Sequence, residues 1–144
     1  MNTVYITYQC QIAARNFLRS KTIDGIEATD IHAGVSGDDM RLPCVICLCQ
    51  SAEADAVESG NWKARLSIAV RTNADDTTAA DHHTLVNAVF SEFLTTTISG
   101  DLSDALADFT ALKVVPVSQS WSIDDRSWIA EMEFDVFCCG SDIS

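Results

Sequence analysis

Cysteine is the residue type whose spacing in this chain most resembles a site for metal or redox chemistry. Of the 6 cysteines, all but one fall in two short clusters: Cys44, Cys47, Cys49, Cys138 and Cys139. A structural zinc site needs four ligands, with each C-x2-C pair on a tight turn. Here Val45 and Ile46 separate Cys44 from Cys47, and β-branched residues favour an extended chain. Because side chains alternate faces along a strand, Cys44 and Cys47 are expected to point in opposite directions.

These cysteines leave two interpretations, a buried strand or a metal or redox site. Cys47 and Cys49 share a face, but two ligands do not close a zinc site, and the adjacent Cys138 and Cys139 diverge. Free cysteine behaves as a small, mostly buried hydrophobic residue. The run at 42–49 is apolar on both faces, so we favour a central strand covered on both sides, in part by another subunit. We expect no metal and no cofactor.

Three other motifs fall short of a catalytic or metal site. In Asp81-His82-His83 the two imidazoles lie about 100° apart on a helix, and neither has an H-x3-H partner. The stretch GVSGD at 34–38 lacks the final glycine of a nucleophile elbow. The stretch NADDTTAAD at 73–81 lacks the glycine and the bidentate glutamate of a calcium loop. We expect a helix-capping turn and then a solvated helix start, and the sequence predicts no enzyme.

The composition limits the classes of partner. The chain has 144 residues and a net charge of −12, from 21 acidic and 9 basic side chains. That length is typical of one domain and can bury a sizeable core without metal or disulfide bonds. Nucleic-acid binding depends on lysine and arginine meeting phosphates, so we do not expect this acidic chain to bind DNA. The start MNTVYITYQCQ shows no basic leader before an apolar segment, and we expect thiols in a reducing cytoplasm.

Hydrophobic periodicity predicts the elements that must position any site. Residues 4–19 carry apolar side chains at helical spacing, whereas residues 20–42 are polar and contain several glycines. We expect an extended, partly mobile arm or loop there, because so long a segment in a compact domain usually binds something. In 62–71 the even positions are apolar and the odd ones mostly polar, which is typical of a half-buried antiparallel strand. Helices are expected over 78–94 and over 101–109.

The C-terminal segment predicts a β-hairpin. If the turn is centred on Asp124-Asp125, Trp121 faces Trp128 and the apolar residues of both strands share one face. A four-residue loop with the same pairing fits equally well, because Asp-Asp is not a preferred two-residue turn. Pro116 indicates that its strand lies at an edge of the sheet or begins just after the proline.

One domain accounts for all of these elements. No internal repeat or low-complexity tract divides the chain. We predict a single α+β domain over 1–144, with a mostly antiparallel four-stranded sheet and helices packed on one face. Within this domain we predict an extended arm or loop at 20–42 and a flexible tail at 140–144.

The exposed faces of two predicted strands carry opposite charges. The first is basic and the second acidic, from Lys63, Arg65 and Arg71 against Glu131, Glu133 and Asp135. Two arrangements satisfy this pattern. The strands pair within one sheet, where each exposed ion pair contributes at most about 1 kcal/mol. Alternatively, the basic strand of one copy meets the acidic strand of a neighbour, and these residues form a subunit interface.

Four stretches of sequence point to a known architecture. They are VICLCQSAEADAVESGNWKARLSIAVRT at 45–72, HHTLVNAVFSEFL at 82–94, DLSDALADFTALKVVPVSQSW at 101–121 and RSWIAEMEFDVFCC at 126–139. In this order they resemble the tail terminator proteins of long-tailed bacteriophages and the related head–tail joining proteins. The similarity covers most of residues 4–139 and is architectural, since that family has no invariant catalytic motif. The length of the polar arm at 20–42 departs from the family's pattern.

The resemblance implies a structural virion protein of the tail or neck, assembled in the host cytoplasm. Such a protein forms a ring, usually a homohexamer, that caps the tail tube and stops polymerisation of the tube protein. Its other face meets the head–tail connector, DNA passes through the lumen without specific binding, and no membrane is involved. Two alternatives stay open: a head–tail stopper or neck protein of similar fold, and a small α+β enzyme or ligand-binding domain.

Two acidic segments receive roles under this hypothesis. The arm is expected to contact a partner subunit through Asp30, His32, Asp38, Asp39 and Arg41. The loop after the first strand is expected to line the ring lumen with Glu53, Asp55 and Glu58, where negative charge repels DNA phosphates. Acids that are merely solvated in a loop are the alternative for this second segment.

Overall fold

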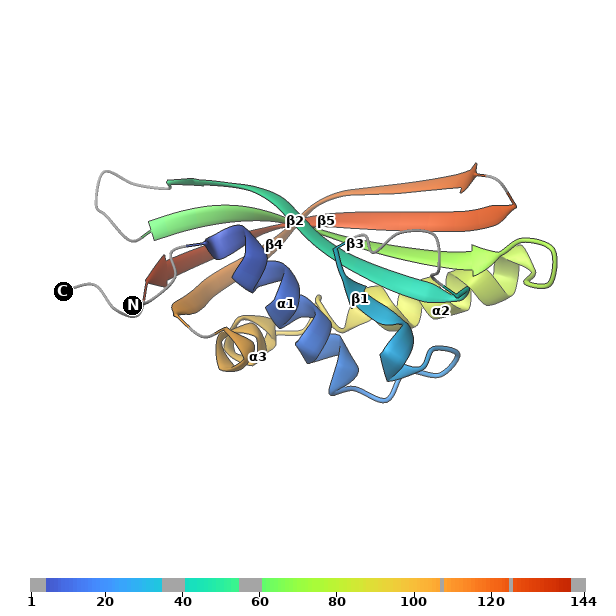
Figure 1. Cartoon of the computed structure of the whole chain (residues 1–144), viewed down its shortest axis with the longest axis horizontal. Coiled ribbons are helices and arrows are strands. Elements are labelled where there is room, and N and C mark those ends of the chain that lie inside the picture. The colour runs from blue at the N-terminus through green and yellow to red at the C-terminus, as the bar shows by residue number, and fades with distance from the viewer. Residues whose placement is uncertain (1–4, 35–40, 55–60, 107, 125, 141–144) are drawn as a thin grey trace.

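The fold consists of a β-sheet with α-helices on one of its faces (Figure 1). A computed structural model describes residues 5–34, 41–54, 61–106, 108–124 and 126–140. In chain order, the elements within these ranges are α1 (Ile6–Arg19), a 3-10 helix (Ala28–Asp30), β1 (Ile31–Ala33), β2 (Cys44–Ala54), β3 (Asn61–Asn73), α2 (Ala79–Ser91), α3 (Ile98–Ala105), β4 (Phe109–Asp124) and β5 (Ser127–Gly140). The predicted α+β class is confirmed.

The sheet has one strand more than predicted. Over the described residues it has 5 strands in the order β1-β2-β3-β5-β4, so the prediction of four strands is wrong. The additional strand is β1, which lies inside the predicted arm at 20–42 and pairs parallel with β2. Its Ile31 is buried, and the Arg19 guanidinium donates a 3.0 Å hydrogen bond to the Ile31 carbonyl. A strand of 3 residues is too short to show the alternation by which strands are recognised in sequence.

The predicted periodicities are confirmed in α1 and β3. The buried apolar residues of α1 recur at helical spacing and face the sheet: Ile6, Cys10, Ala13, Ala14, Phe17 and Leu18. The polar Gln9 is buried with them. Along β3 every second residue from Ala64 to Thr72 is buried, and β3 occupies the centre of the sheet. None of the helices in the described ranges is long and apolar enough to span a membrane.

The helix α2 begins in the predicted helix-capping turn and leads into the core. Thr78 Oγ1 accepts a 3.1 Å hydrogen bond from the Asp81 amide, which satisfies a free donor of the first turn. Just after α2, the ring of Phe93 lies 5.3 Å from that of Phe17 and 5.3 Å from that of Phe134, between ring centroids. Through these three rings, the residues that follow α2 pack against both α1 and β5.

The β4–β5 hairpin is present, but its predicted register is wrong. Trp121 lies opposite Ala130 rather than Trp128. The turn falls one residue later than predicted, and Arg126 takes the positive φ of 67° that tight hairpin turns favour. Between the turn and the bulge at Val117, each residue is shifted by two pairing partners and keeps its predicted face. Trp121 and Trp128 are therefore still neighbours, with ring centroids 5.4 Å apart. Beyond that bulge the shift is one, so Val115 lies opposite Asp135 and not opposite Phe134 as predicted.

β4 is an edge strand, as Pro116 indicates. Two bulges interrupt its pairing with β5 and leave Leu112 and Val117 out of register. The described residues of β4 beyond Val115 are all exposed. At the hairpin end, β4 is therefore solvent-exposed on both faces and along its unpaired backbone edge.

Candidate functional site

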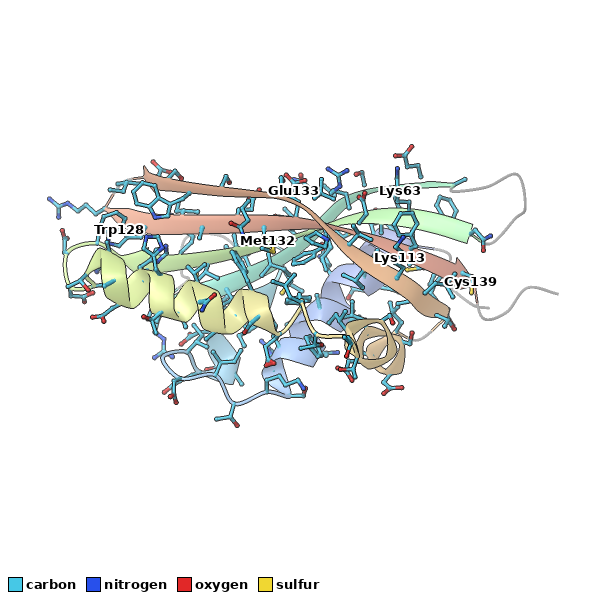
Figure 2. All side chains as sticks on the ribbon, turned by 180° about the vertical axis from the view of Figure 1, so that it is seen from behind. Lys63, Lys113, Trp128, Met132, Glu133 and Cys139 are labelled. Carbon is cyan, nitrogen blue, oxygen red and sulfur yellow. The ribbon has the colours of Figure 1, made fainter. Side chains whose placement is uncertain are left out.

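Opposite charges meet on the sheet face that the helices leave open. Arg65 Nε donates a 2.8 Å hydrogen bond to Asp135 Oδ1, and Arg65 Nη1 donates one of 3.2 Å to Glu133 Oε2. Lys63 Nζ lies 3.5 Å from Glu53 Oε1 on β2. Figure 2 shows Lys63 and Glu133 on the side of the sheet away from the helices. The hydrogen bonds to Asp135 and then to Glu133 raise the pKa of Arg65, so this cation stays charged.

Arg71 and Glu131 stand apart from these ion pairs. Arg71 Nε is buried and has no hydrogen-bond partner among the described residues. Within the same ranges, neither Arg71 nor Glu131 forms an ion pair. The structure thus shows the within-chain arrangement for Arg65 with Glu133 and Asp135, whereas Lys63 pairs with β2 instead. A role of the six charged residues at a subunit interface stays a prediction.

The residues predicted to contact a partner through the arm divide into three groups. Arg41 Nη2 lies 2.9 Å from Asp30 Oδ2 and 3.2 Å from Glu27 Oε2, so Arg41 and Asp30 bind each other. The hydrogen bond to Asp30 raises the pKa of Arg41. His32 is on β1, and its buried Nε2 has no partner among the described residues. Asp38 and Asp39 lie outside the described residues.

The predicted lumen loop is described only at its start. Glu53 is exposed, and its carboxylate forms the ion pair with Lys63. Asp55 and Glu58 lie outside the described residues. A place for this segment in a ring lumen stays a prediction.

The buried cysteines form a cluster of thiols. Cys10 of α1 and Cys49 of β2 share a hydrogen bond that raises the pKa of Cys10 and lowers that of Cys49. Burial raises the pKa of Cys47 and of Cys138 to about 12. Across the described ranges, no group of three or more His, Cys, Asp or Glu side chains is arranged to hold a metal ion. The predicted core position of the cysteines on β2 is confirmed, since Cys44, Cys47 and Cys49 are buried.

His82 contradicts the prediction of a solvated helix start, whereas His83 is exposed as predicted. The His82 side chain is fully buried, and its Nδ1 lies 2.8 Å from Thr72 Oγ1. The indole of Trp128 stacks on it with ring centroids 6.1 Å apart, and Trp128 Nε1 donates a 3.0 Å hydrogen bond to the Thr77 carbonyl. Burial and then the neighbouring His83 lower the pKa of His82. His82 is therefore a neutral core residue that joins α2 to the sheet.

An uncovered groove between α2 and β4 is the feature that the sequence analysis missed. Its volume is about 660 Å³, and its lining includes Phe90, Trp121 and Met132. The only signal in the sequence is the alternation in SQSWSI at 118–123, which places Trp121 and Ile123 on one face. The alternation predicts an apolar face, but it does not reveal whether a helix covers that face.

Comparison with known proteins identifies a shared fold. No family model and no curated protein matches this sequence. The structure is similar to a chain of the virion of a native gene transfer agent particle, with a TM-score of 0.66 and 14% sequence identity. The match covers 96% of this chain and 100% of that chain. The two chains therefore share one fold over nearly all of this chain and the whole of the other.

Proposed function

We propose that this protein is a structural, non-enzymatic component of a phage-like particle, and specifically a tail terminator. One observation supports the proposal above the others. The fold matches a virion chain of a gene transfer agent over 96% of this chain and all of the other. The order of elements in the sequence supports the same role through its resemblance to tail terminators.

The geometry of the sheet suits a structural role in such a particle. Its two longest neighbouring strands, β4 and β5, have 16 and 14 residues and form a long hairpin at one edge. On the open face Arg65 is held by two carboxylates of β5, which limits sliding of β3 against β5. A stiff plate of this kind keeps its shape when copies assemble around a tube.

In the proposed assembly, copies form a ring, by expectation a homohexamer, at the head-proximal end of the tail tube. One face contacts the last ring of tube protein and prevents further addition, and the other meets the head–tail connector. The net charge of −12 repels the phosphates of DNA, so DNA passes through the lumen without specific binding. The proposed location is the tail or neck of the virion, after assembly in the host cytoplasm.

Deletion of the gene in a particle-producing host tests the proposal. A terminator controls tail length, so its loss is expected to give tails of variable and excessive length that carry no heads. Electron microscopy of the lysate measures the length distribution, and expression of the wild-type protein in trans is the control. Tails of normal length beside heads that have lost their DNA would instead indicate a head–tail stopper. Unchanged particles would reject a structural role.

Co-purification separates the same alternatives biochemically. A terminator is expected to retain the tail tube protein, whereas a stopper or neck protein retains a portal or adaptor protein. Purified particles that contain no copy of this chain by peptide mass spectrometry would contradict both.

A further inference from the structure

Exposed apolar side chains of the described residues form two separate groups, and Leu42, Leu112 and Val117 are exposed outside both. At the hairpin end, Trp121 and Ile123 of β4 are 51% and 55% exposed, and Leu94, which lines the groove just after α2, is 52% exposed. At the other end, Tyr5 and Tyr8 are 67% and 58% exposed. Figure 1 shows that α1 begins near the Gly140 end of β5, whereas the hairpin turn lies at the opposite end. We name the first set the groove patch and the second the tyrosine patch.

The groove patch contains the groove between α2 and β4. Its floor is apolar and aromatic, with Phe90, Trp121 and Met132. Amide and hydroxyl side chains complete the lining, including Asn87 and Gln119. This combination suits the side chain of tyrosine, which has an apolar ring and a hydroxyl that needs a hydrogen-bond partner when buried.

The charge distribution favours a second copy as the occupant of the groove. Copies of a chain with net charge −12 repel each other wherever their acidic surfaces meet. The groove lining contains no Asp, Glu, Lys or Arg. Tyr5 and Tyr8 are themselves uncharged and lie three residues apart at the start of α1, with Tyr5 just before the helix and Tyr8 in its first turn. Contact between the two patches therefore joins two copies without placing like charges opposite each other.

We infer that the groove patch of one copy binds the tyrosine patch of the next copy, head to tail. The two patches are different surfaces at opposite ends of the molecule, so the contact is heterologous. A heterologous contact repeats from copy to copy and closes into a ring when the rotation permits. A two-fold contact between identical patches would cover one end of the sheet and leave the other exposed. The inference rests on the proposed function only in that a terminator must form a ring.

Two variants test this contact with the purified full-length protein. The groove variant is Trp121→Ser with Ile123→Ser, and the tyrosine variant is Tyr5→Ser with Tyr8→Ser. All four side chains are at least half exposed, so both variants are expected to fold, as circular dichroism will show. Because Trp121 also contacts Trp128, Leu94→Glu is a second groove variant whose change lies on the α2 side of the groove. The control is Leu42→Ser, which changes an exposed apolar residue outside both patches.

Sedimentation velocity and native mass spectrometry give the readout. The wild type and the Leu42→Ser control are expected to form oligomers. Each patch variant is expected to sediment as a monomer, with an apparent Kd raised roughly tenfold or more. An equimolar mixture of the groove and tyrosine variants retains one intact contact, so it is expected to form a dimer and no larger species.

Several outcomes would overturn the inference. They are a monomeric wild type, a patch variant that assembles as the wild type does, and a mixture that stays monomeric. Assembly lost in the groove variants but not in the tyrosine variant would indicate a two-fold contact or another occupant. None of these measurements involves a virion, so this interface can fail while the proposed function stands. Equally, particles that lack the protein reject the function whatever the solution assembly shows.

Discussion

Arg65 and Asp135 lie directly opposite each other in the β3–β5 pair, and Arg65 Nε donates a 2.8 Å hydrogen bond to the Asp135 carboxylate. Glu133 is two residues along β5 and accepts from the other arm of the same guanidinium. One cation thus pairs with two acids on the same face of a neighbouring strand. A shift of the strands by one residue would send these side chains to opposite faces, so the three charges favour the observed register.

Replacement of Arg65 by alanine is expected to lower the free energy of unfolding by about 1 kcal/mol. The variant leaves Glu133 and Asp135 close together without their cation. Urea denaturation measures the change. The matched control is Lys63→Ala, for which a smaller loss is expected because its partner Glu53 is 75% exposed on its side chain. Equal losses in the two variants would show that solvent screens both pairs alike.

His82 is expected to make folding stability depend on pH. Its pKa is lowered from the ordinary value of 6.5, so below that pH the unfolded chain binds a proton that the folded chain does not. The contribution of His82 to stability is therefore fully present above pH 6.5 and declines as the pH falls through 6.5 towards the folded pKa. Urea denaturation at about pH 7.5 and about pH 5.5 measures this loss.

His82→Gln is expected to reduce the pH-dependent loss of stability relative to the wild type. The variant is also expected to be less stable at both pH values by about 1–3 kcal/mol, because it disturbs the buried bond to Thr72. His83→Gln is the control, since His83 is exposed, and it should keep the pH dependence of the wild type. If the stability of His82→Gln depends on pH as that of the wild type does, the pH dependence comes from the carboxylates and not from His82.

Periodicity and charge in the sequence were sufficient to predict α1, α2, the central strand β3 and the hairpin. These elements are long, and each buries one face, so their apolar residues recur at a fixed spacing. The short helix was predicted over 101–109 but is observed at Ile98–Ala105, and Phe109 begins β4 instead. The same reasoning failed for β1, whose 3 residues are too few to establish a period. It also failed for the hairpin register, because bulges at Leu112 and Val117 and the turn at Arg126 depend on local backbone geometry.

The candidate site was predicted less completely than the fold. The basic and acidic faces were visible because charges of one sign recur with strand spacing in both β3 and β5. The pairing of Asp30 with Arg41 was not predicted, since these residues lie in a segment without periodicity. The groove at Trp121 was also missed, because coverage by a helix depends on the path of the chain rather than on local sequence. The burial of His82 was missed for the same reason, because it depends on contact with Trp128, which is distant in the sequence.

The cysteines are expected to differ sharply in reactivity. Cys139 is partly exposed, whereas the other 5 are buried. Burial keeps Cys47 and Cys138 protonated, with a pKa of about 12, and the thiolate is the reactive form. A chromogenic disulfide reagent at about pH 8 should therefore modify Cys139 rapidly in the folded protein and all the thiols after denaturation. Cys139→Ser should abolish the rapid phase, and its persistence would show that the core opens readily.

Arg41→Ala is expected to loosen the segment that holds β1 against β2. Asp30 has a side chain only 13% exposed, and the Arg41 guanidinium is its ion-pair partner at 2.9 Å. Without that partner the largely buried carboxylate loses its compensating charge. Because β1 lies at the edge of the sheet and, among the described strands, pairs with β2 alone, the loss should appear as faster amide exchange at Ile31–Ala33.

Hydrogen exchange read by mass spectrometry or NMR measures this local opening, and exchange in β3 serves as the internal reference. Asp30→Asn combined with Arg41→Ala removes both charges, so it should restore part of the protection that Arg41→Ala loses. Acceleration confined to Ile31–Ala33 would support local opening of the edge strand, since β1 is short and flanked by non-sheet residues. Equal acceleration in β3 would instead show that the ion pair stabilises the whole domain. Unchanged exchange in Arg41→Ala would mean that burial of Ile31, rather than the ion pair, keeps β1 in the sheet.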